Sequence, residues 1–226
     1  MVSEIFETVT VETGPNPTFS IIWMHGLGAD GHDFEPLVPE LLEGGMPAMR
    51  FVFPHAPVRP VTINNGYQMR AWYDIIGIDR RSAEDFAGIA ATTEAIGDLI
   101  EAENQRGVAT QRIAIAGFSQ GGAMALHIGT RHPEKLAGVI ALSSYLPRSS
   151  DLATARSAAN QATSIFMAHG TQDPVVPYPL GDESRRLLES AGYSVEWHAY
   201  PMPHGLCEPE VAHLRSWLKR VCDAPQ

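Results

Sequence analysis

Residues 111–122 of this chain read QRIAIAGFSQGG, and the fold can be worked out from this stretch outward. The apolar run at 113–116 predicts a buried strand, and the AMALHI that follows at 123–128 predicts a helix. Between them, Ser119 stands in a G-x-S-x-G motif, which is typical of a strained strand-to-helix turn that lifts a serine hydroxyl clear of the sheet. Flanking glycines leave room for such a backbone. Short motifs also arise by chance, but a strand before this one and a helix after it favour a catalytic nucleophile.

Length and composition predict one substantial core. The 226 residues are 44% hydrophobic, which suits a single α/β domain spanning 1–226. A net charge of −10 without a basic run argues against nucleic acid as a partner. The first residues lack the cationic and apolar regions of a signal peptide, and no apolar run approaches the ~20 residues of a membrane span. We therefore expect a cytoplasmic protein without stable membrane insertion.

Two cysteines, Cys207 and Cys222, are too sparse for a disulfide framework. If both lie on a C-terminal helix, helical rise separates them by about 22 Å, beyond the roughly 7 Å that a disulfide allows. Free thiols agree with a reducing compartment.

Apolar periodicity predicts strands that alternate with helices. The expected strands cover 2–11 (an edge strand), 18–24, 49–53, the run before Ser119, 136–143, 164–169 and 193–200. The expected helices cover 34–42, 82–103, the segment after Ser119, 180–190 and 208–221, with Ser82 as an N-cap and Asp85 completing a capping box. This alternation predicts a mostly parallel central sheet with helices on both faces.

A serine nucleophile needs a base, and the base needs an orienting carboxylate. In α/β-hydrolases these follow the serine in the order acid, then histidine. Asp173 lies in HGTQDPVVP (169–177) and His204 in YPMPHG (200–205), and each segment follows an expected strand. Taken alone, Asp173 before a proline can be turn chemistry, and His204 can be an exposed loop residue. Among the rival histidines, His169 precedes the acid, His198 lies within a strand and His213 lies on the last helix.

Two further segments are candidates for the substrate site. The loop HGLGADG (25–31) after a buried strand is a simple turn or the second half of an oxyanion hole, and the elbow favours the second interpretation. Residues 55–79 show no clear period and are expected to be a long loop. We expect Met69, Trp72, Tyr73 and Ile75 within it to surround a substrate pocket, although they would equally serve to cover the sheet edge. No H-E-x-x-H motif and no cysteine pair at ligand spacing is present, so no metal is expected. The Gly-Leu-Gly loop is not a G-x-G-x-x-G motif and no Walker pattern appears, so no cofactor is expected either.

Five motifs together resemble one known family. HGLGAD (25–30), RAWYD (70–74), GFSQGG (117–122), LSSYL (142–146) and HGTQDPVVP are similar to those of small bacterial carboxylesterases related to acyl-protein thioesterases, and the resemblance covers nearly the whole chain. It implies an α/β-hydrolase fold with a minimal lid, a triad of Ser119, Asp173 and His204, and an oxyanion hole of the Leu27 and Gln120 amides. Several members of this family are homodimers. Ser144 and Pro203 depart from the family pattern, because many relatives have glycine at both positions.

The predicted function is that of a serine carboxylesterase, which hydrolyses short- to medium-chain esters through an acyl-enzyme on Ser119. An acyl-protein thioesterase or a lysophospholipase is the alternative within enzymes. A hydrolase-fold module that binds a ligand without turnover is the alternative from another class, because fold alone does not determine function.

Overall fold

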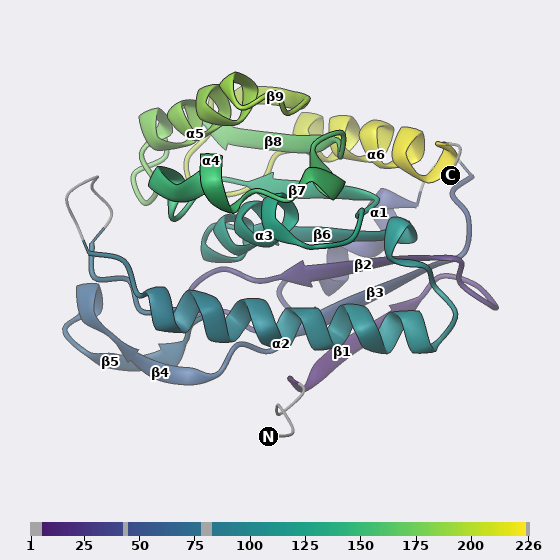
Figure 1. The fold of residues 1–226 in the computed structure, drawn as a ribbon, viewed down its shortest axis with the longest axis horizontal. Coiled ribbons are helices and arrows are strands. Elements are labelled where there is room, and N and C mark those ends of the chain that lie inside the picture. Colours follow the sequence, from purple (N-terminus) through teal and green to yellow (C-terminus); the bar gives the residue numbers. More distant parts are fainter. Residues whose placement is uncertain (1–5, 43–44, 78–82, 225–226) are drawn as a thin grey trace.

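A computed structural model describes residues 6–42, 45–77 and 83–224 of the chain (Figure 1). Seven strands form one sheet in the order β1-β3-β2-β6-β7-β8-β9. They are β1 (Thr8–Glu12), β2 (Phe19–Met24), β3 (Met49–Pro54), β6 (Ile113–Phe118), β7 (Gly138–Leu142), β8 (Ile165–Gly170) and β9 (Val195–Tyr200). Only β1 is antiparallel to its neighbour; the other five pairings are parallel. The predicted mostly parallel sheet is confirmed.

Helices cover both faces of the sheet, as predicted (Figure 1). They are α1 (Val38–Leu41), α2 (Phe86–Gln105), α3 (Gln120–Arg131), α4 (Leu152–Ala155), α5 (Tyr178–Ser190) and α6 (Glu208–Asp223), and a 3₁₀ turn (Glu35–Leu37) leads into α1. Strand β2 is buried on both sides because its side chains alternate between two clusters. Ile22 packs in the cluster with α2 and α3, whereas Ile21 packs in the cluster with α1 and α6. In the part of the chain that the structure describes, no helix combines the length and apolarity that crossing a membrane requires.

The start of α2 differs from the prediction. Asp85 itself is the N-cap, because its carboxylate accepts a hydrogen bond of 2.9 Å from the Gly88 N–H. The capping box that places Asp85 three residues inside the helix is therefore wrong, and the predicted N-cap Ser82 lies outside the described residues. The edge strand is confirmed as β1, but it begins at Thr8, and residues 2–5 lie outside the described part.

The segment 55–79 is not the unstructured loop that we expected. Strands β4 (Val58–Val61) and β5 (Tyr67–Arg70) form an antiparallel hairpin within it, and residues 78–79 lie outside the described part. The connection ends in Asn65 and Gly66 with φ angles of 56° and 75°, a conformation that asparagine and glycine adopt at low cost. The hairpin exposes Val58 and Tyr67 and lies beside the sheet rather than in it.

The parallel sheet gathers the predicted functional segments at one edge. The loops that follow β2, β6, β8 and β9 all leave carboxyl ends of parallel strands, and in open α/β sheets that edge is where ligands bind.

Candidate active site

Ser119 occupies a strained turn between β6 and α3. Its φ and ψ angles are 54° and −118°, a conformation that few residues other than glycine adopt, and 8% of its surface is exposed. A Cβ on Gly117 would lie 2.2 Å from the Gly121 carbonyl carbon, and a Cβ on Gly121 would lie 2.2 Å from the Met24 oxygen. Both glycines of the motif are therefore required by backbone contacts, which is the predicted physical reason for the spacing.

The loops after β8 and β9 are joined through their backbones. The Thr171 N–H donates to the Tyr200 oxygen over 2.7 Å, and the Gln172 N–H donates to the Met202 oxygen over 3.2 Å. Gly170 permits this approach, since a Cβ there would lie 2.4 Å from the Met202 oxygen. Two segments about thirty residues apart in the chain are thus held side by side.

Asp173 and His204 meet where these loops touch. The His204 Nδ1 lies 2.6 Å from the Asp173 Oδ2, a distance typical of a strong hydrogen bond between an imidazole and a carboxylate. The other carboxylate oxygen accepts bonds of 2.8 and 2.9 Å from the N–H groups of Val175 and Val176. The carboxylate side chain is fully buried, so the orientation of both oxygens is fixed by these three donors.

His204 lies beside the elbow. Its ring centroid is 4.7 Å from that of Phe118, the residue that directly precedes Ser119, and 15% of its side chain is exposed. The structure therefore brings His204 and Asp173 together and places His204 against the residue next to Ser119.

The loop 25–28 packs directly against the elbow. A Cβ on Gly26 would lie 3.5 Å from the Ser119 Cβ, so this loop approaches the serine at backbone distance. His25 fixes the loop from below: its Nδ1–H donates to the Gly26 oxygen over 2.7 Å, and its Nε2 accepts from the Ala56 N–H over 3.1 Å. Burial lowers the pKa of His25 to about 4, so the ring is neutral at pH 7, as this bonding requires.

The two predicted oxyanion donors have no acceptor of their own. Within residues 6–42, 45–77 and 83–224, neither the Leu27 nor the Gln120 N–H donates a hydrogen bond. Gln120 is the first residue of α3, where backbone N–H groups lack intrahelical partners and carry the positive end of the helix dipole. By contrast, the next amide of the loop, that of Gly28, is bonded to the Arg70 oxygen over 2.9 Å.

Two of the four predicted pocket residues are not at the surface. Trp72 is 0% exposed and Tyr73 is 3% exposed, so neither presents accessible surface in this structure, and their place in a substrate pocket stays a prediction. They are buried because they pack into the hydrophobic cluster that also contains the inner face of α2. Met69 and Ile75 are half-buried, and the Met69 sulfur lies 3.8 Å from a Cβ built on Gly28. For these two the pocket role stays a prediction.

The two departures from the family pattern differ in consequence. Ser144 is buried, and its side chain fills the space beside Gly122 in the first turn of α3. Pro203 is exposed on the loop before His204, which still bonds to Asp173.

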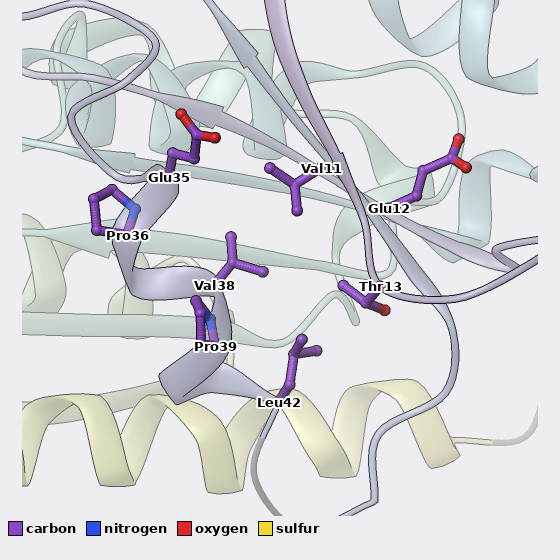
Figure 2. A pocket seen from close by; sticks show the side chains of 8 residues that line it. All are labelled: Val11, Glu12, Thr13, Glu35, Pro36, Val38, Pro39 and Leu42. Carbon is purple, nitrogen blue, oxygen red and sulfur yellow. The ribbon is translucent and has the colours of Figure 1, made fainter.

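One groove, of about 510 Å³, contains none of the predicted site residues. Figure 2 shows the side chains that line it. It lies between β1 and the turn and helix at 35–42 and is lined by Val11, Glu12, Thr13, Glu35, Pro36, Val38, Pro39 and Leu42. Glu12 pairs with Arg50 near the amino end of β3, so that part of the groove lies at the end of the sheet opposite Ser119. No group of three or more metal-ligating side chains that could hold an ion is found in the described part of the chain.

Sequence order alone missed one residue of the site. His169 precedes Asp173 in the chain, which argues against it as the base, yet its Nε2 lies 3.5 Å from the Asp173 Oδ2 and 2.8 Å from the Val176 oxygen. The carbonyl can only accept, so Nε2 carries the proton, and burial lowers the pKa of this histidine. The signal that could have identified it is its position at the end of β8, four residues before the acid.

Comparison with known proteins agrees with this architecture. Residues 7–222 match the family model described as Phospholipase/Carboxylesterase. An acyl-protein thioesterase 1 from Neurospora crassa is 43% identical over 89% of this chain and 86% of its own length. One from Mycosarcoma maydis is 37% identical over 96% of both chains. The crystal structure of Zea mays acyl-protein thioesterase 2 superposes with a TM-score of 0.86 at 25% identity, covering 96% of this chain and 99% of that one. These relatives are eukaryotic, whereas the motifs pointed to bacterial carboxylesterases.

Proposed function

Because this chain belongs to the phospholipase/carboxylesterase family of α/β-hydrolases, and is thus a hydrolase, we propose that it hydrolyses acyl thioesters with Ser119 as the nucleophile. The observation that carries the proposal is the 2.6 Å hydrogen bond between Asp173 and His204 beside the strained turn of Ser119. A neutral imidazole that donates through Nδ1 to a buried carboxylate has its Nε2 lone pair free to accept a proton from a serine hydroxyl.

In the proposed mechanism, the Ser119 Oγ attacks the acyl carbonyl carbon while His204 takes its proton. Asp173 stabilises the imidazolium that forms, and the amides of Leu27 and Gln120 donate to the oxyanion. The tetrahedral intermediate collapses, and the thiolate departs with the proton from His204, leaving an acyl-ester on the serine. A water molecule, deprotonated by the same imidazole, then releases the carboxylic acid and restores the serine. Each oxyanion donor is worth about 3 kcal/mol of transition-state stabilisation in enzymes of this kind.

We propose a thioester rather than a carboxylic ester as the substrate because of the names of the relatives. The relatives from Neurospora crassa and Mycosarcoma maydis both carry the name acyl-protein thioesterase 1, and the alignments cover 86% or more of their own length. Carboxylic esters, including those of lysophospholipids, remain the second candidate because the family description names carboxylesterase and phospholipase. The same acyl-enzyme serves both reactions, and only the leaving group differs.

The acyl chain is proposed to lie along Met69 and Ile75. Met69 lies next to Gly28, which is in the loop that carries the proposed oxyanion donor Leu27. The side chains of Met69 and Ile75 are both partly exposed. The exposed Tyr67, two residues before Met69 on β5, would extend this apolar path along the hairpin.

The experiment compares matched acyl thioesters and nitrophenyl esters from C2 to C16, with unmodified protein and Ser119→Ala. We expect turnover of both classes, higher kcat/KM for thioesters, and loss of turnover in the variant. Turnover that survives in Ser119→Ala would refute the nucleophile. A preference for oxygen esters at every chain length would establish the second candidate.

A module that binds without turnover is the remaining alternative. An active-site fluorophosphonate labels a nucleophilic serine that has a working base, so we expect stoichiometric labelling that Ser119→Ala abolishes. Absence of both labelling and turnover would favour the binding module. The homodimer stays a prediction, which sedimentation equilibrium would test.

A further inference from the structure

Trp72 connects the two halves of the proposed oxyanion hole. Its backbone N–H donates to the Gln120 side-chain oxygen over 2.9 Å, and its indole Nε1–H donates to the His25 carbonyl oxygen over 2.8 Å. One residue therefore bonds to the helix that carries one donor and to the loop that carries the other.

The Gln120 side chain closes the first of these connections. Its amide nitrogen donates to the Tyr73 oxygen over 2.7 Å, so the amide group bonds to the backbone of two consecutive residues. Gln120 is 2% exposed, and water does not compete for these bonds. The amide group thus fixes the first residue of α3 to the segment 72–73.

The indole makes the second connection. The His25 carbonyl precedes Leu27 by only two residues, and the His25 and Trp72 rings lie 4.9 Å apart. Trp72 is itself anchored, because the Thr92 hydroxyl of α2 donates to its carbonyl oxygen. The loop with Leu27 is thereby held by a side chain that α2 and the elbow helix fix in place.

We propose that Trp72 is a positioning residue that sets the distance between the Leu27 and Gln120 amides, an inference that rests on the proposed function. An oxyanion donor works only when it lies about 2.7 to 3.1 Å from the charge that develops in the transition state. A shift of about 1 Å in such a group costs on the order of 100-fold in rate. The ground-state carbonyl carries much less charge, so the loss falls on kcat and not on KM.

The chain offers a matched control for this residue. Trp23, on β2, is likewise buried at 1% exposure, but its indole N–H has no hydrogen-bond partner within the described residues. Trp72→Phe and Trp23→Phe therefore remove the same atoms from the core, and only the first removes a hydrogen bond to the oxyanion loop.

Steady-state kinetics on a thioester substrate test the proposal. We expect kcat to fall by about 10- to 100-fold in Trp72→Phe, with KM within about twofold, and by less than about threefold in Trp23→Phe. A trifluoromethyl ketone forms a tetrahedral adduct whose oxyanion needs the same two donors. Its affinity should fall by the same factor as kcat/KM in Trp72→Phe.

The pH profile separates positioning from general damage. In the described part of the chain, no hydrogen bond or ring contact joins Trp72 to the Asp173–His204 pair, so the acid limb of kcat/KM should not move in Trp72→Phe. Gln120→Met is the second variant, because it keeps the backbone N–H and removes both side-chain bonds. It should reproduce the fall in kcat and in ketone affinity.

Three outcomes overturn the proposal. These are equal losses of kcat in Trp72→Phe and Trp23→Phe, a loss confined to KM, and an unchanged affinity for the ketone. Failure of the proposed function looks different, since the unmodified protein would then not turn over thioesters or esters, or Ser119→Ala would stay active.

Discussion

Asp173→Asn is the change that most directly tests the proposed triad. The Oδ1 atom accepts hydrogen bonds from the Val175 and Val176 amides, and an asparagine side-chain oxygen can accept the same two bonds. The asparagine NH₂ group then takes the place of Oδ2, which in the unmodified protein lies 2.6 Å from the His204 Nδ1. We therefore expect the loop to keep its conformation, while the asparagine NH₂ group and the His204 Nδ1–H, both donors, face one another.

This contact between donors changes the tautomer of the imidazole. The NH₂ group favours the ring form whose Nδ1 accepts, and in that form Nε2 carries the proton and cannot accept one from Ser119. The variant also loses the charge that stabilises the imidazolium. The analogous change in a serine protease triad costs about 10⁴-fold in kcat, which corresponds to roughly 5.5 kcal/mol in the barrier.

The loss would be measured as kcat for a C8 thioester between pH 5 and 9. The melting temperature of each variant would be measured at the same pH values. Asp182→Asn is the control, because Asp182 pairs with Arg185 on the surface of α5 and should leave turnover unchanged. In a double variant with Ser119→Ala, the two losses should not add, because the residues act as one unit. Asp173→Asn with more than a tenth of the original kcat and normal stability would refute the role of this carboxylate.

Three further predictions follow from burial and close contacts. Glu210 is 0% exposed, and burial raises the pKa of its carboxyl to about 8, although a hydrogen bond with the Cys207 backbone N–H partly opposes that shift. The folded protein then binds a proton that the unfolded chain releases above about pH 4.5, so stability falls as pH rises from there to about 8. Glu210→Gln should remove this loss, on the order of 4 kcal/mol at pH 9 and little at pH 5, and urea titrations that give the same gain at both pH values would contradict it. Gly121→Ala should abolish turnover and lower the melting temperature, because its Cβ would lie 2.2 Å from a backbone oxygen of β2. Gly97→Ala on α2, where the new methyl meets nothing within 4 Å, should instead be neutral or slightly stabilising, and equal effects of the two changes would count against the packing argument. His169→Phe should lower kcat about 10-fold or more by removing a buried N–H that holds the acid's loop, and His169→Gln, which can still donate, should recover part of it. If phenylalanine and glutamine behave alike in kcat, this N–H has no role.

Local rules account for what the sequence predicted correctly. The strand, elbow and helix around Ser119 follow from an apolar run, two glycines and a second apolar run, each of which acts within a few residues. The parallel sheet follows from alternating elements, and its carboxyl edge then brings Asp173 and His204 toward the serine. The pairing of Asp173 with His204 could therefore be predicted from the order of the elements, without knowledge of other tertiary contacts.

The hairpin at 58–70 was missed because its strands are short and half-exposed, so they carry no strong period. Its turn residues, Asn65 and Gly66, were visible in the sequence, but the flanking segments showed no alternating pattern that would identify them as paired strands.

The burial of Trp72 could not be predicted from the sequence. The sequence of an irregular segment does not tell whether an aromatic residue in it lines a pocket or enters the core. Trp72 is in the core because it packs against α2.

The sequence by itself determined the order of elements, the strand-turn-helix around Ser119 and the chain order of Asp173 and His204, the proposed acid and base, because these depend on near neighbours and on the direction of parallel strands. Tertiary structure alone decided that Trp72 bonds to both segments proposed for the oxyanion hole and that His169 reaches Asp173. Those contacts join residues whose relative positions are set by how the loops pack at the sheet edge. No local pattern in the chain encodes that packing.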